Sequence, residues 1–337
     1  VSASCPSAAH SMNRLRGCPQ WSCIGVDNIC FLTNFEVHFM NFLLIGIYSV
    51  KEVKIMSEYL IDSNGLKIEF HYEDSEASET LLFLPGSFAN TSAWKGITKA
   101  LKIPCKKVFT SLRGYGDTEE SRSAKDYKID HQLEIIRAIS KKLNSNFHIV
   151  GHSMGGLVGF AAVFSGEFPI KSIITFEANP PWVLDTSRFQ ETLNKTVKMA
   201  TNFEKEVMED KNDSAEIIID FYGGDGTFSS FPEKVQDFCR ANAHVNLLDW
   251  LPIIRSDPPK FERSLFKKSL NEMPVKLVVG QNANFLIKDI NSELCSLFKK
   301  HVEQEIKGAG HFLISTHPKD CANAIDEFII SQRIENG

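Results

Sequence analysis

One stretch of the sequence runs from an apolar segment through a glycine-flanked serine into a segment of small residues. It spans residues 147–164 and reads FHIVGHSMGGLVGFAAVF. The apolar start is typical of a buried strand, and the small-residue end favours a helix. In the Gly-x-Ser-x-Gly between them, Gly151 and Gly155 remove side chains that would clash in a sharp turn. The stretch therefore predicts a strand, a tight turn that carries Ser153, and a helix whose positive N-terminal end lies at that serine.

A histidine near the C-terminus is the candidate base for Ser153. His311 lies in a glycine-rich loop, after a strand-like segment (Val302–Ile306) and before an expected terminal helix (Pro318–Ile330). A histidine in a loop that follows the last strand can reach over a sheet and accept the proton of a serine hydroxyl. A solvated loop histidine is the competing interpretation, and the position after the last strand favours the base. His152 is the neighbour of Ser153 in the chain, and we interpret it as local packing on the other side of the turn.

The turn after an earlier strand offers hydrogen-bond donors for an oxyanion. Thr80–Leu84 has the pattern of a buried strand, and Pro85–Phe88 ends it in a turn. We expect the backbone N–H groups of Ser87 in this turn and of Met154 after the serine to be the two donors. A well-aimed donor of this kind contributes about 3 kcal/mol to the stabilisation of an acyl-transfer transition state. Without the serine turn, an ordinary strand-ending turn would be the better interpretation.

Four motifs follow one another along the chain. Residues 84–94 begin Leu-Pro-Gly-Ser-Phe and end at Trp94, residues 112–118 read Leu-Arg-Gly-Tyr-Gly-Asp-Thr, and the serine turn and the late histidine come after them. From about residue 57 to its C-terminus the sequence thereby resembles the α/β-hydrolase superfamily. The first motif is similar to the family's oxyanion loop, with Pro85 where many members carry His, and the second to its Arg-Gly-x-Gly-x-Ser segment. The resemblance implies an α/β-hydrolase fold, a mostly parallel, doubly wound sheet with an inserted helical cap.

The acidic partner of the histidine departs from the usual pattern of that family. Most members carry it three residues after the glycine that ends the seventh strand, but here the strand is Val275–Val279 and the position holds Ala283. Glu177 follows the preceding strand, Ile170–Phe176, and lipases of the superfamily are known to place their acid there. The resemblance therefore favours Glu177, with a turn cap or an ion pair as its competing role. The alternatives that stay open are Asp289, Asp185 and the side-chain amide of Asn282.

Strand and helix patterns alternate from residue 58 onward, except in one interval. Alternation of this kind favours a mostly parallel sheet with helices on both faces. Residues 182–272 have helix-like periodicity and no convincing buried strand. We therefore predict an extension (1–55), a hydrolase core in two parts (56–181 and 273–337) and a helical cap (182–272). The cap would shape a pocket, for which the candidate lining residues are Phe88, Trp94, Phe221, Tyr222 and Trp250. Phe228 and Phe231 belong to the same set of cap aromatics that could line the pocket, and at least half of that set is expected to be plain cap core.

The first 55 residues lie outside these patterns. Four of the eight cysteines fall within residues 1–30, and the apolar stretch Phe39–Val50 is too short to span a bilayer. We expect no membrane span. Three interpretations of the extension stay open. They are a translated upstream region without a role, a targeting extension, and a loosely bound arm. We favour the first, which would make Met56 the native start.

Composition narrows the classes of function. The chain has 43% hydrophobic and 23% charged residues and a net charge of −5, without the basic stripe of a nucleic-acid-binding protein. Histidine and cysteine do not cluster at metal spacing, and no phosphate-binding or dinucleotide-binding loop is present, so we expect no metal and no cofactor. The cysteines beyond residue 55 are scattered, which favours reduced thiols and a cytoplasmic location. A small-molecule substrate is expected, and the oligomeric state stays open.

The leading hypothesis is a serine hydrolase that cleaves a small or medium ester, thioester or lactone. Ser153 would attack the carbonyl, His311 would shuttle the proton, and Glu177 would hold the imidazole. A C–C hydrolase or a perhydrolase would use the same residues. The hypothesis from another class is a small-molecule binding protein on the same fold, which the alanine at position 283 keeps open.

Overall fold

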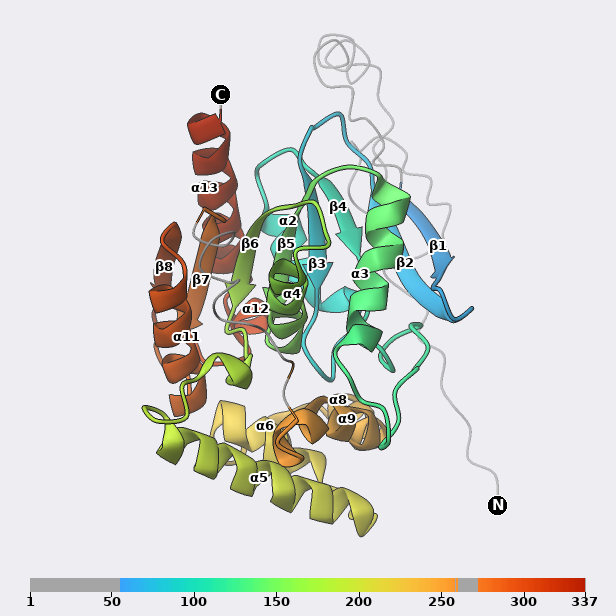
Figure 1. Ribbon diagram of the computed structural model, residues 1–337, viewed down its shortest axis with the longest axis vertical. Helices are drawn as coiled ribbons and strands as arrows, with labels where there is room; N and C mark the ends of the chain where they lie inside the picture. The colour runs from blue at the N-terminus through green and yellow to red at the C-terminus, as the bar shows by residue number, and fades with distance from the viewer. Residues whose placement is uncertain (1–54, 258, 260–271, 337) are drawn as a thin grey trace, which may run out of the picture. The chain divides into compact units, whose positions relative to one another are not determined.

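Eight strands form one sheet within the residues that the computed structural model describes, which are 55–257, 259 and 272–336. The order across the sheet is β1-β2-β4-β3-β5-β6-β7-β8, with β1–β2 and β2–β4 antiparallel and every other pair parallel (Figure 1). The strands are β1 (Ile55–Ile61), β2 (Lys67–Glu73), β3 (Thr80–Leu84), β4 (Lys106–Phe109), β5 (Phe147–His152), β6 (Ile170–Phe176), β7 (Val275–Gly280) and β8 (His301–Ile306). The mostly parallel sheet predicted from the sequence is confirmed.

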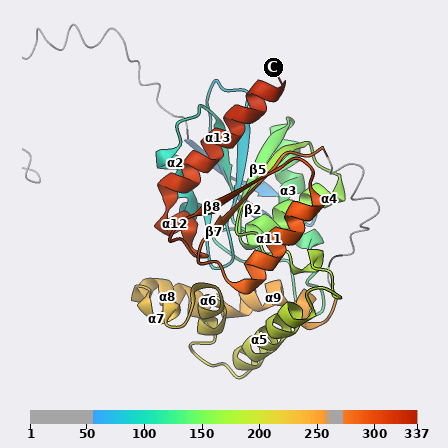
Figure 2. The same cartoon turned by 90° about the vertical axis from the view of Figure 1, so that its left-hand side faces the viewer.

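Helices cover both faces of the sheet, as Figure 2 shows. One face carries η1 (Thr91–Trp94), α2 (Lys95–Ala100), α12 (Leu313–Thr316) and α13 (Pro318–Asn336), and the other carries α3 (Asp130–Leu143), α4 (Met154–Ser165) and α11 (Phe285–Leu297). Two apolar clusters fill the layers between sheet and helices. Every residue of β3 and β5 is buried, because both strands lie in the middle of the sheet with helices above and below.

The helix that follows the serine turn lies very close to the sheet. Its residues from Met154 to Val163 are all buried, so it has no polar face. A Cβ at Gly155 would lie 2.1 Å from the carbonyl oxygen of Leu84, and a Cβ at Gly159 would lie 3.0 Å from Ile149. The small residues that the sequence shows after Ser153 are therefore what lets α4 pack against the central strands.

The chain between β6 and β7 is helical wherever the structure describes regular elements in it. These elements are η2 (Pro181–Val183), α5 (Gln190–Met208), α6 (Ala215–Gly223), α7 (Thr227–Ser230), α8 (Glu233–Ala241) and α9 (Ala243–Ile254). The last five, called the cap helices below, lie beyond one end of the sheet (Figure 1) and enclose their own apolar cluster. The rest of the predicted cap, residues 258 and 260–271, lies outside the described residues, so the cap's boundaries stay a prediction.

The predicted extension also lies outside the described part, apart from Ile55. Among the residues that are described, no helix is both long and apolar enough to cross a membrane. Cys105, Cys239, Cys295 and Cys321 are free thiols, and all but Cys295 are buried.

A fully buried ion pair fixes the loop that follows β4. The guanidinium of Arg113 binds the carboxylate of Asp62, and both side chains are inaccessible to solvent. Arg113 also donates through Nε to the carbonyl of His131 and through Nη1 to that of Glu119. Burial alone would raise the pKa of Asp62, but hydrogen bonds from the amides of Leu66 and Asn64 and the charge of Arg113 outweigh it and lower that pKa.

Asp62→Asn should lower the free energy of unfolding at pH 7 by about 3 kcal/mol, because it leaves the Arg113 charge buried without a counter-ion. The folded-state pKa of Asp62 is lowered, so its contribution is present above its unfolded value of about 3.9 and is lost as the pH falls through the folded value. Urea unfolding at pH 7 and below pH 4 measures this. Glu191→Gln, which removes one partner of an exposed ion pair with Lys195, is the control and should leave the urea unfolding curve unchanged. The difference in the free energy of unfolding between wild type and Asp62→Asn should shrink as the pH falls. A difference that grows as the pH falls would contradict a lowered pKa at Asp62.

Candidate active site

Ser153 occupies a strained turn between β5 and α4. Its backbone angles are φ 49° and ψ −118°, which a non-glycine residue adopts only when its surroundings hold it there. The amide of Ser153 donates to the carbonyl of Phe176 (3.1 Å), and a Cβ at Gly151 would lie 2.7 Å from the Cα of Gly156. The residue is 5% exposed and lines a cavity. The two glycines of the motif thus lie in close backbone contacts, as the sequence predicts.

The structure brings three of the predicted site residues together in one hydrogen-bonded chain. His311 Nε2 lies 2.9 Å from Ser153 Oγ, and His311 Nδ1 lies 2.8 Å from an oxygen of Glu177. All three side chains are buried. Because a carboxylate oxygen accepts hydrogen bonds, Nδ1 carries the ring proton and Nε2 is left to accept the proton of the serine hydroxyl. This is the arrangement in which a histidine can act as the base for a serine.

Glu177 is held at the end of β6 by the neighbouring strand. Its second oxygen accepts a hydrogen bond from the backbone N–H of Gly280, at the end of β7 (2.7 Å). Its own backbone has φ 49°, and its amide donates to the carbonyl of Val278 (2.9 Å). A Cβ at Gly280 would lie 2.5 Å from the carbonyl oxygen of Ala309, so a glycine is needed where the carboxylate approaches. One carboxylate oxygen is thereby fixed, and the other faces His311.

The other candidate acids bind elsewhere. Asp289 accepts a hydrogen bond from Thr192 Oγ1 on α5 (2.5 Å). Asp185 accepts from the amide and hydroxyl of Ser187, within its own turn. Asn282 donates to the carbonyl of Gly308 (3.2 Å), and Ala283 is buried in the apolar cluster of the cap helices. Of the candidates from the sequence, Glu177 is the one whose side chain contacts the imidazole of His311.

His152 lies on the other side of His311. One ring nitrogen donates to the carbonyl of His311 (2.8 Å), and the two imidazole rings lie 5.1 Å apart. Burial and the neighbouring His311 lower the pKa of His152 to about 3, so its ring is neutral at ordinary pH. His152 also lines the cavity. Its role as local packing is compatible with this position, because its ring holds the backbone of the His311 loop through the hydrogen bond to the carbonyl.

The loop after β3 lies directly against Ser153. A Cβ at Gly86 would lie 3.1 Å from the Cβ of Ser153, and the next residue but one, Phe88, has φ 55°. Within the described residues, the amides of Ser87 and Met154 have no hydrogen-bond acceptor. Unpaired N–H groups beside a serine hydroxyl are what an oxyanion requires. The geometry is compatible with the donor role predicted for both.

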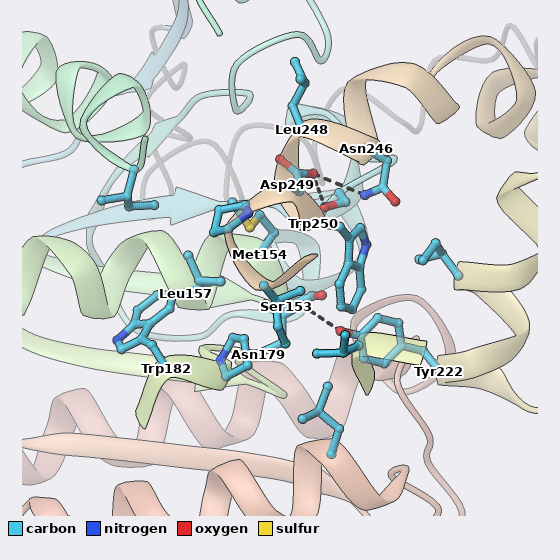
Figure 3. Close-up of a pocket in the computed structure, with 18 of the residues that line it drawn as sticks. Ser153, Met154, Leu157, Asn179, Trp182, Tyr222, Asn246, Leu248, Asp249 and Trp250 are labelled. Carbon is cyan, nitrogen blue, oxygen red and sulfur yellow. Dashed lines mark hydrogen bonds between the residues drawn. The ribbon is translucent and has the colours of Figure 1, made fainter. Parts of the chain in front are cut away.

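A cavity of about 790 Å³ opens beside Ser153 and extends under the cap helices (Figure 3). Side chains from the core and from the cap line it together, and most of them are apolar. Among those near the serine or on the cap wall are Leu157, Trp182, Leu193, Val197, Ile218, Ile219, Leu248 and Leu286. The predicted lining residues Phe88, Tyr222 and Trp250 also face this cavity.

Two predicted lining residues lie elsewhere, and the prediction was wrong for both. Trp94 is fully buried on the opposite face of the sheet, where it packs against Phe83 and Phe176, because η1 turns it away from the serine. Phe221 packs behind the cavity wall, with its ring 5.6 Å from that of Phe285. Phe228 and Phe231 are cap core or contacts at its edge.

Two cap residues contact the site in ways that the sequence did not predict. The ring of Tyr222 on α6 stacks on the imidazole of His311, at 4.1 Å and 13° between planes. Asp249 on α9 accepts a hydrogen bond from the hydroxyl of Ser87 (2.7 Å). A signal for Asp249 was available, since it is the one carboxylate in the apolar segment 243–254. No group of three or more potential metal ligands occurs in the described ranges.

Comparisons with known proteins identify the fold family of the chain. A sequence model described as the alpha/beta hydrolase fold matches residues 79–318. Lipase 3 of Moraxella sp. (strain TA144) is 28% identical over 131 residues, 38% of this chain and 38% of the relative. Epoxide hydrolase 4 of Homo sapiens is 26% identical over 116 residues, 34% of this chain and 32% of the relative. The matches thus span well under half the length of these two relatives.

Solved structures share the fold. An esterase from Thermogutta terrifontis superposes with a TM-score of 0.61 at 17% sequence identity, covering 82% of this chain and 99% of the esterase. At this identity the likeness shows the architecture alone, because one fold supports many chemistries.

Proposed function

The chain belongs to the α/β-hydrolase fold family, and on that basis we propose that it is a serine hydrolase that cleaves carboxylic esters with an apolar acyl group. The observation that carries the proposal is the hydrogen-bonded chain from Ser153 Oγ through His311 to Glu177, with distances of 2.9 and 2.8 Å. It lies at the wall of a cavity large enough for a drug-sized ligand. Relatives titled lipase and esterase agree with this class.

The proposed reaction has two halves. Ser153 Oγ attacks the ester carbonyl and gives its proton to His311 Nε2, and the new oxyanion accepts hydrogen bonds from the amides of Ser87 and Met154. His311 then protonates the leaving alkoxide, and the acyl group stays on the serine. Water, deprotonated by the same imidazole, attacks the acyl carbon, and the imidazolium returns the proton to Ser153 Oγ as the bond to the acyl carbon breaks and the acid is released. Glu177 keeps the proton on Nδ1 and stabilises the imidazolium in both halves.

Epoxide hydrolysis is the main competing chemistry among the relatives by name. It requires a carboxylate nucleophile at the turn, whereas this chain has a serine there. The hydroxyl is already hydrogen-bonded to a base, which favours acyl transfer.

The lining of the cavity suggests the substrate class. Leu157 lies one helical turn after Ser153, and Leu193 and Val197 on α5 face the same space. Each CH₂ group buried in such a place contributes about 0.8 kcal/mol of binding. A medium-length acyl chain is therefore the group that this cavity would bind best.

Ser153→Ala should lower kcat for a p-nitrophenyl ester by about 10⁴-fold or more, because the covalent step is lost. A fluorophosphonate probe should label the wild type and leave the variant unlabelled. The melting temperature should stay within a few degrees, since the hydroxyl contributes little to packing. Near-normal turnover by Ser153→Ala would refute the proposal.

The acyl preference gives a second prediction. From acetate to octanoate esters, kcat/KM should rise by roughly three- to fourfold per CH₂ until the cavity is full. Val197→Trp narrows the cavity at the α5 wall and should reduce kcat/KM for octanoate much more than for acetate. Thr201→Trp, on an exposed position of the same helix, is the matched control and should leave the series unchanged. A series that is flat in the wild type would show that the cavity does not bind the acyl chain.

A further inference from the structure

A carboxylate on the cap makes four hydrogen bonds to groups that surround the oxyanion loop. Asp249 Oδ2 accepts from Ser87 Oγ (2.7 Å), from the hydroxyl of Tyr115 (3.0 Å) and from Nδ2 of Asn246 (3.2 Å). Its Oδ1 accepts from Nη1 of Arg122 (2.5 Å). The Asp249 side chain is 4% exposed. Figure 3 shows Asp249 and Asn246 at the end of the cavity away from Tyr222.

In each hydrogen bond of this cluster, the chemistry of the groups decides which one donates and which one accepts. Burial opposes the charge of Arg122, but Asp249 and Glu120 outweigh it and raise its pKa, so Arg122 stays charged. Burial and the nearby carboxylate raise the pKa of Tyr115 well above its ordinary value, so its hydroxyl keeps the proton that it donates. Asn246 must turn its NH₂ toward the carboxylate, because its carbonyl oxygen would be repelled there. Asp249 therefore accepts four hydrogen bonds.

The backbone also brings α9 close to the core at this point. Gly114 has φ +78°, and a Cβ there would lie 2.6 Å from the side chains of Val245 and Glu120. Gly114 and Tyr115 belong to the Arg-Gly-x-Gly motif of the sequence. This motif, fixed by the buried pair of Arg113 and Asp62, therefore forms the surface on which α9 and its carboxylate are docked.

Of these contacts, the one with Ser87 bears on the chemistry. Ser87 carries the amide proposed as an oxyanion donor, and its hydroxyl oxygen lies two bonds from the same Cα. The following residue, Phe88, is held at φ 55°, so the loop is in a conformation that needs support from its surroundings. Holding the side chain of Ser87 restrains its Cα and, through it, the peptide N–H bonded next to it. The contact spans 162 residues of the chain and joins the cap directly to the loop.

We propose that Asp249 is a positioning residue for the oxyanion site, through which the cap helix α9 holds the amide of Ser87 in the direction that the transition state requires. The proposal rests on the serine-hydrolase function proposed above and extends it, because it makes the cap a part of the catalytic apparatus as well as a cover. Its contribution is expected in the transition state more than in substrate binding, since the oxyanion forms only there.

Asp249→Asn should lower kcat by about 10- to 100-fold and change KM by less than about threefold, because a misdirected oxyanion donor costs rate and spares ground-state binding. The asparagine NH₂ would face Arg122 or the three other donors, so the cluster cannot keep all its hydrogen bonds. An alkyl trifluoromethyl ketone, which Ser153 converts to a hemiketal oxyanion, should bind more weakly by the same factor. The corresponding methyl ketone should bind to the variant with the same affinity as to the wild type.

Ser87→Ala removes the hydroxyl and keeps the amide, so it tests the same contact from the other side and also serves if Asp249→Asn fails to fold. It should lower kcat and the trifluoromethyl ketone affinity in the same ratio. The double variant should be no worse than the poorer single variant, because both changes break one contact.

Asp220→Asn is the matched control. Asp220 is another cap carboxylate, and it accepts hydrogen bonds from the amides of Gly226 and Phe228 (2.7 Å each), within the cap itself. It should lower the melting temperature and leave kcat and the trifluoromethyl ketone affinity unchanged. A kcat loss in Asp220→Asn equal to that in Asp249→Asn would mean that general loosening of the cap is the cause.

The inference is overturned if Ser87→Ala keeps full kcat, or if Asp249→Asn changes only KM or the melting temperature. Failure of the serine-hydrolase function looks different: the wild type itself would not bind the trifluoromethyl ketone more tightly than the methyl ketone, and Ser153→Ala would keep its turnover.

Discussion

The hydrogen bonds of Glu177 at the carboxyl edge of the sheet are the interaction on which the site depends. One oxygen is fixed by the amide of Gly280 at the end of β7, and the other binds His311 in the loop after β8. His311 in turn reaches the serine that follows β5. Four strand ends are thereby joined through one buried carboxylate. Because parallel strands bring their carboxyl ends to one edge, residues 158 and 134 positions apart from His311 can meet it there.

The cap helices contact both halves of this arrangement. Tyr222 stacks on the ring of the candidate base, and Asp249 accepts a hydrogen bond from the hydroxyl of Ser87 in the loop after β3. The cavity between cap and core is lined from both sides, so the cap shapes the space beside Ser153 as well. A change of cap position would therefore alter the environment of the imidazole, of Ser87 and of the cavity at once. For the serine hydrolase proposed above, this means that substrate selection and rate would be coupled.

The parts that could be predicted from the sequence are those with a local signal. The serine turn is marked by glycines two residues on either side, and the buried strands by short apolar runs. Glu177 was identified because the usual position held Ala283 and a carboxylate ended the strand beside the serine strand. Trp94 was misplaced because its distance in sequence from the oxyanion loop does not reveal which face of the sheet η1 turns it toward. Asp249 itself had a local signal, as the one carboxylate of segment 243–254, but its contacts with Arg122, Tyr115 and Ser87 join residues 127 to 162 positions apart through cap docking, which no local pattern encodes.

The central claim is that the acid of this site comes from the end of β6. The most direct test compares kcat for Glu177→Gln with kcat for Asp289→Asn. Asp289 is the alternative acid after the seventh strand, and in the structure it accepts a hydrogen bond from Thr192 on the cap. Glu177→Gln keeps the shape of the side chain and removes the charge that stabilises the imidazolium, so kcat should fall by roughly 10²- to 10⁴-fold with KM little changed. Asp289→Asn should cost less than about tenfold. If instead kcat fell by roughly 10²-fold or more in Asp289→Asn and stayed unchanged in Glu177→Gln, the acid would come from the loop after β7. Glu177 would then serve only to hold the end of β6 against β7.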